Sequence, residues 1–93
     1  MMTPERAEEV AQDALVWILQ TDDLAGIFLG WSGADPSDLR ARASDSDFLA
    51  SVLEFLTMDD AWVIGYCQDR NMDPGVPMAA RRRLDGPGQD GWN

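Results

Sequence analysis

Apolar residues return at helical spacing along most of the chain, and polar residues fill the positions between them. Within residues 4–20 the apolar positions fall mainly on one side, and the carboxylates lie mostly on the other. Thr3 suits the N-cap of this segment, and Pro4 suits its first helical position. The pattern predicts a helix over residues 4–20 whose buried face contains Val10, Ala14, Trp17 and Ile18.

A second helix is predicted between Thr21 and Ser32. Two aspartates follow Thr21 and favour the positive end of a helix dipole, and Gly33 suits the end of the helix. The apolar stripe of this segment consists of Leu24, Ile27, Phe28 and Trp31. Gly26 and Gly30 lie among these residues at a cost of about 1 kcal/mol each relative to Ala, so we expect them to allow a neighbouring helix to approach closely.

The middle of the chain predicts a short helix followed by a central one. Asp35 and Pro36 open a helix over residues 36–43, in which Leu39 is the large apolar anchor. Residues 47–58 come next, and their wide apolar arc is broken mainly by Ser51 and Glu54. Such an arc is typical of a helix buried on most sides, and we expect this helix to be the centre of the domain.

Residues 61–67 form an apolar run without a period, so that periodicity alone also allows a strand. No other segment alternates to pair with a strand, and we therefore predict a helix that continues to about residue 71. The short link before this run predicts a hairpin with the preceding helix. A last helix is predicted over residues 78–84, before the Gly86-Pro87-Gly88 stop.

These segments predict an all-α fold, a compact single domain of about five or six short helices around the buried helix near residues 47–58. The domain is expected over residues 1–86, and residues 87–93 are expected to be a flexible C-terminal tail. A length of 93 residues suits one domain, and an apolar content of 45% argues against disorder throughout.

The chain is strongly acidic, with a formal net charge of −10. Phosphate backbones and anionic membrane surfaces repel such a surface, so nucleic acid is an unexpected partner and no membrane association is expected. No apolar run approaches the length of a membrane span. A reducing, cytoplasmic location is the expected one.

The chain contains no histidine, and Cys67 is its one cysteine. An internal disulfide and a four-ligand zinc site are therefore excluded, and hydroxyl nucleophiles have no imidazole base. No phosphate-binding loop or dinucleotide motif is present. We expect no catalytic residues, no cofactor and no metal, and we expect Cys67 to be a buried structural thiol.

Residues 69–73 match the first three ligand positions of a calcium loop. Pro74 stands where a glycine should follow, and Ala80 stands where the last carboxylate belongs, so a helix-ending turn is the favoured interpretation. Carboxylate pairs also precede three apolar helical runs, where such groups cap helices. An enzyme that uses only carboxylates is a minor alternative. The pairs are Asp22 with Asp23, Asp45 with Asp47, and Asp59 with Asp60.

Arg81, Arg82 and Arg83 are consecutive and form the one basic cluster of the chain. Such a cluster could bind phosphate, nucleic acid or an acidic partner surface. Consecutive residues of a helix point in different directions, so we favour a role in balancing the acidic surface within the molecule.

The chain has four tryptophans, a high number for its length. Trp17, Trp31 and Trp62 lie on apolar stripes and are predicted to be core residues. Trp92 lies in the predicted tail, where it is either a binding anchor or a terminal residue without contacts.

Four stretches of the chain, residues 3–8, 26–29, 32–40 and 48–56, resemble the bacterial domain-of-unknown-function 3572 family, and the similarity covers most of residues 3–86. The resemblance implies a small helical cytoplasmic protein. It implies no known activity, and it carries over no functional residues.

The residues favour a non-enzymatic protein–protein interaction module, an adaptor or small regulator, with homodimerisation as a further possibility. Trp31 near the junction of the second and third helices is the first expected contact, and Arg81, Arg82 and Arg83 are the next. Nucleic-acid or nucleotide binding through the three arginines is the alternative.

Overall fold

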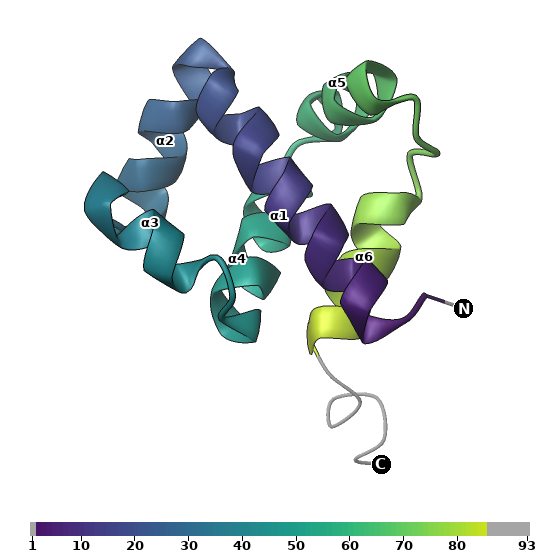
Figure 1. Ribbon diagram of the computed structural model, residues 1–93. Coiled ribbons are helices and arrows are strands. Elements are labelled where there is room, and N and C mark those ends of the chain that lie inside the picture. Colours follow the sequence, from purple (N-terminus) through teal and green to yellow (C-terminus); the bar gives the residue numbers. More distant parts are fainter. Residues whose placement is uncertain (1, 86–93) are drawn as a thin grey trace.

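A computed structural model describes residues 2–85 of the chain. All regular structure within these residues is helical, and the predicted all-α single domain is confirmed (Figure 1). The six helices are α1 (Pro4–Gln20), α2 (Asp22–Ser32), α3 (Pro36–Arg42), α4 (Ser46–Leu56), α5 (Asp60–Arg70) and α6 (Val76–Asp85). The predicted tail, with Trp92, lies outside the described residues.

Local chemistry sets the helix ends close to the predicted places. Thr3, Asp45 and Asp59 cap α1, α4 and α5, and the side chain of each accepts a hydrogen bond from a backbone N–H (3.1, 3.1 and 2.8 Å). Gly33 ends α2 with a φ of 71°, in the left-handed region that glycine adopts without strain. The carboxylates of Asp45 and Asp59 thus act as caps, as predicted.

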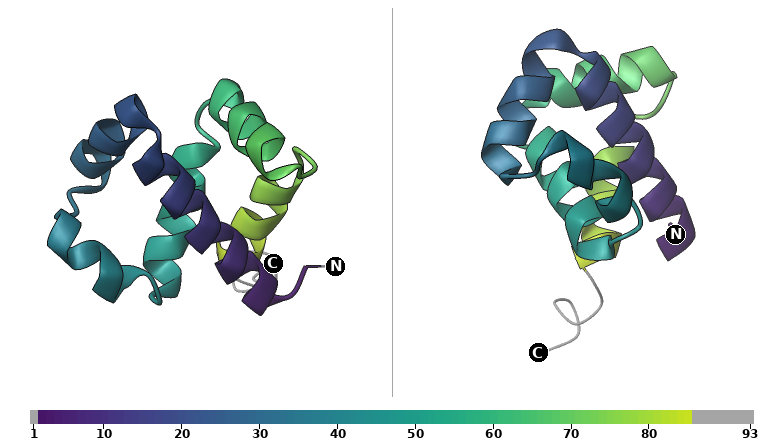
Figure 2. Two further views of the ribbon diagram at one scale, coloured as in Figure 1. Left: turned by 45° about the horizontal axis from the view of Figure 1, so that its top comes forward. Right: turned by 60° about the vertical axis from the view of Figure 1, so that its left-hand side comes forward.

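The core lies where α1, α4 and α6 pack against one another. Helix α4 is buried on most sides, as its wide apolar arc predicts, but α1 shares the central position because it also packs against α2. Figures 1 and 2 show α2 and α3 on one side of α1 and α4, with α5 and α6 on the other. The largest fully buried side chains include Tyr66, Phe28, Phe55, Ile18, Leu49, Leu53 and Leu56.

The apolar run of residues 61–67 is helical, which excludes the strand interpretation. The predicted hairpin of α4 and α5 is wrong, because α4 packs closely against α1 and α6 and its backbone has only sparse contact with α5. Long side chains bridge α5 to the core instead. Trp62 stacks on Phe55 of α4 with ring centroids 4.9 Å apart, and Tyr66 packs edge-on against Trp17 of α1 at 5.7 Å.

Two expectations for α2 are also wrong. Among the described residues, a Cβ atom added at Gly26 or Gly30 would meet nothing within 4 Å, so none of the six helices lies close to either glycine. Trp31 is 41% exposed and is not a core residue, whereas Trp17 is buried as predicted. The reason is that α2 buries only Leu24 and Phe28 and α3 has no buried residue, so no element within residues 2–85 covers the outer face of α2.

Candidate functional site

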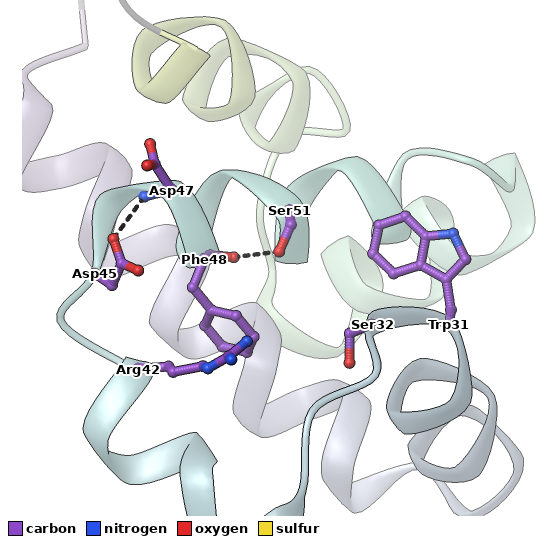
Figure 3. Close-up of a pocket in the computed structure, with 7 residues that line it drawn as sticks. All are labelled: Trp31, Ser32, Arg42, Asp45, Asp47, Phe48 and Ser51. Carbon is purple, nitrogen blue, oxygen red and sulfur yellow. Dashed lines mark hydrogen bonds between the residues drawn. The ribbon is translucent and has the colours of Figure 1, made fainter.

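An open hollow of about 480 Å³ lies where the C-terminal ends of α2 and α3 meet the N-terminal half of α4 (Figure 3). It brings Trp31, predicted as the first contact residue, together with charged side chains from two other segments. We call it the Trp31 hollow. Its lining residues are Trp31, Ser32, Arg42, Asp45, Asp47, Phe48 and Ser51.

The indole of Trp31 rests on the core while part of it faces solvent. Its ring centroid lies 5.4 Å from that of Phe55 and 6.4 Å from that of Phe28, and both of these phenylalanines are fully buried. Contacts on the inner side restrict the rotamers of Trp31. A partner would therefore meet an aromatic surface that is already ordered, at little cost in side-chain entropy.

Arg42 and Phe48 form the opposite wall of the Trp31 hollow. The guanidinium carbon of Arg42 lies 5.7 Å from the ring centroid of Phe48, within the range of a cation–π contact. No carboxylate among the described residues forms a salt bridge with Arg42. Its guanidinium donors are thus available to a ligand.

The polar groups of the Trp31 hollow are partly engaged within the protein. Asp45 accepts a hydrogen bond from the backbone N–H of Asp47, and the Ser51 hydroxyl donates to the carbonyl of Phe48 at 2.6 Å. Ser32 accepts from the backbone N–H of Ala34 at 3.1 Å. The carboxylates of Asp45 and Asp47 belong to exposed residues. The arrangement offers an aromatic face, a guanidinium and two carboxylates to a docking ligand.

A second hollow of about 370 Å³ lies along α5 and the loop after it, lined by residues that include Ile64, Met72 and Cys67. Cys67 is buried, as predicted, and its thiol donates to the carbonyl of Asp73 at 3.6 Å. Burial, with a smaller contribution from the charge of Asp73, raises the pKa of Cys67. The thiol therefore stays protonated at neutral pH, in keeping with a structural role.

A polar cluster that the sequence did not reveal ties α5 to α1. The Tyr66 hydroxyl donates to Asp13 at 2.7 Å, and Arg70 Nε donates to the same carboxylate at 3.0 Å. Trp17 Nε1 donates to Asp69 at 2.7 Å. Burial and the hydrogen bond to Asp13 raise the pKa of Tyr66 far above its usual value. These contacts position a helix, and none of them faces the Trp31 hollow.

The three arginines of α6 do not form one continuous basic surface. Arg81 donates to Thr57 Oγ1 at 3.3 Å and pairs with Asp85 at 3.8 Å. Arg82 is exposed, whereas Arg83 is half-buried on another side of the helix. Arg81 thus has contacts within the protein, as the charge-balance interpretation predicts.

Residues 69–73 form the helix-ending turn that the sequence favoured. Helix α5 ends at Arg70, and Asn71 follows in the left-handed conformation with a φ of 54°. Asp69 accepts from Trp17, and Asp73 Oδ1 accepts from the backbone N–H of Gly75 at 2.8 Å. Over residues 2–85 there is no group of three or more metal-ligating side chains.

The chain belongs to a protein family of unknown function. The family is the one described as protein of unknown function (DUF3572), and its model matches residues 4–87, which confirms the resemblance seen in the sequence. No curated protein and no solved structure matches the chain. Among the described helices, none is long and apolar enough to cross a membrane.

Proposed function

We propose that the chain is a non-enzymatic protein-interaction module, an adaptor or small regulator of the cytoplasm, whose contact surface centres on Trp31. The observation that carries the proposal is the position of this indole. It is 41% exposed, its inner side packs against Phe55, and it borders an open hollow.

Several physical features support binding of a protein at this place. Tryptophan and arginine are the residue types most often found at the energetic centre of protein interfaces. The hollow offers both, with the Arg42 guanidinium ordered against Phe48. Ile27 is 50% exposed and lies one helical turn before Trp31 on the same face of α2. The apolar surface thus extends beyond the hollow itself.

Nucleic-acid binding through Arg81, Arg82 and Arg83 stays a hypothesis from the sequence. The net charge of −10 opposes it, and Arg81 is engaged with Thr57 and Asp85. No feature of the fold favours it over a contact at Trp31.

Affinity purification from the native cytosol tests the proposal with two matched variants. Trp31→Ala removes the central indole, and Val16→Ala truncates an apolar residue of α1 that is similarly exposed, at 46%. We expect wild-type chain and Val16→Ala to retain the same protein in stoichiometric amount. Trp31→Ala should lose it, because truncating a central tryptophan of an interface costs about 2 kcal/mol or more.

Thermal unfolding of the purified variants separates lost binding from lost folding. Equal retention of the partner by Trp31→Ala, with the variant folded, would refute a contact at Trp31. Recovery that a nuclease abolishes would transfer the assignment to the arginines of α6.

A further inference from the structure

The outer face of α2 consists of two adjacent rows of exposed residues. Asp23, Ile27 and Trp31 follow one another at intervals of four residues, which places them on one side of the helix. The neighbouring row is Asp22, Gly26 and Gly30, and all six residues are exposed. Eleven helical residues span about 16 Å, so the face is a strip long enough for three turns of a partner helix.

The two glycines make this strip flat. Nothing lies within 4 Å of where their Cβ atoms would be, so the backbone of α2 is open to close approach from outside. Each glycine costs the helix about 1 kcal/mol relative to Ala, and no contact within the domain offsets that cost. A partner helix packed against bare backbone gains van der Waals contact that a side chain at either position would prevent.

The strip is apolar in its middle and acidic at its N-terminal end. Asp22 and Asp23 lie at its N-terminal end. At the other end Trp31 borders the hollow, and the charged residues of its lining, Arg42, Asp45 and Asp47, lie on the far side of the hollow from Trp31 (Figure 3). Charge complementarity therefore favours a partner whose apolar stripe has basic residues at the end that meets Asp22 and Asp23.

A second copy of the chain does not meet this requirement. An antiparallel pair of α2 helices would place Asp22 and Asp23 of each copy at the Trp31 end of the other strip, which contains no basic residue. A parallel pair would bring like acidic ends together, and each copy carries a net charge of −10. Neither arrangement gives Asp22 and Asp23 a basic partner on the strip.

The geometry points to an amphipathic helix of a different protein, with Arg or Lys at the end of its apolar stripe that meets Asp22 and Asp23, docked lengthwise on α2. This inference rests on the proposed function and adds the chemistry of the partner.

A displayed library of amphipathic helical peptides of about 18 residues tests the inference. Every peptide carries the same leucine stripe, and the residues at its two ends are varied among acidic, neutral and basic types. Selection on the wild-type chain is expected to enrich Arg and Lys at one end, the end that meets Asp22 and Asp23. Affinity of the selected peptides should fall about tenfold or more in Gly30→Gln, which adds a side chain beside Trp31 on the flat row of the strip. Val16→Gln, on α1, should leave it unchanged.

Neutralising the acidic end isolates the electrostatic part. The double variant Asp22→Asn, Asp23→Asn should weaken binding of the basic-ended peptides by roughly three- to tenfold at low salt. The matched control is Glu5→Gln with Asp60→Asn, which neutralises first-turn carboxylates of α1 and α5 and should change nothing.

The outcomes separate this inference from the proposed function. The selected peptides could bind without any preference for charged ends, and this binding could still be lost in Trp31→Ala and Gly30→Gln. That result would overturn the partner chemistry and leave the Trp31 contact standing. Binding insensitive to Gly30→Gln, or no retained peptide, would overturn docking on α2. If the wild-type chain is a dimer and Gly30→Gln is a monomer, docking of a different protein on α2 is overturned, and the occupant of the strip is a second copy of the chain.

Discussion

Replacing both Gly26 and Gly30 by Ala should make the domain more stable. Both residues lie inside α2, and each added methyl group would enter open space. The helix propensities of Gly and Ala differ by about 0.8–1.0 kcal/mol per position. Since the new methyl groups meet nothing, the double variant should gain about 1.5–2 kcal/mol of unfolding free energy. For a domain of this size, that gain corresponds to a rise in Tm of about 5–15 °C.

Two other glycines supply the controls. Gly33→Ala should lose about 1 kcal/mol or more, because a φ of 71° strains any residue with a Cβ atom. Gly65→Ala, whose Cβ would lie 3.5 Å from the Trp17 ring, should change stability less than the α2 pair does. Urea unfolding followed by tryptophan fluorescence, with thermal melts, measures all three. Unchanged or reduced stability of the double variant would refute the open outer face of α2.

Three further predictions concern other parts of the molecule. Because folding raises the pKa of Tyr66, the contribution of this residue to the unfolding free energy should be fully present below about pH 10 and should be lost as the pH rises further. Tyr66→Phe should flatten this decline. Absorbance at alkaline pH reports ionisation of the one tyrosine directly. Asp13→Ala should cost about 1–2 kcal/mol by urea unfolding, since it leaves Tyr66 and Arg70 without their shared acceptor, and no loss would show that the cluster is not formed. If Arg81, Arg82 and Arg83 bind nucleic acid, affinity should fall steeply with salt and vanish in the triple Arg→Ser variant, whereas salt-insensitive binding would contradict that role.

Local signals allowed the helices to be predicted. A cap such as Asp59 and a stop such as Gly33 act within a few residues, so the sequence around them contains the whole signal. The apolar arc of α4 likewise predicts a buried helix whatever covers it. These features need no knowledge of how the helices are arranged.

What the sequence could not reveal depends on the arrangement. An apolar stripe marks a face that favours contact, but it does not say whether the domain supplies the contact, and Trp31 was placed in the core for that reason. The hairpin of α4 and α5 failed because α6, which follows later in the chain, packs against α4. The contact of Tyr66 with Asp13 joins residues 53 apart in sequence, and neither has a local pattern that indicates the other.

The way α5 is attached also determines how the domain opens. Helix α5 buries only Tyr66 and Cys67, and hydrogen bonds to Asp13 and from Trp17 hold it against α1. Its release would expose Tyr66 and the ring faces of Trp17 and Phe55, which is less apolar surface than global unfolding exposes, and so would depend less steeply on urea. Amide hydrogens of α5 should therefore exchange through a local opening, whereas those of α1 and α4 should exchange only through global unfolding. The domain would then contain two units of unequal cooperativity within one fold.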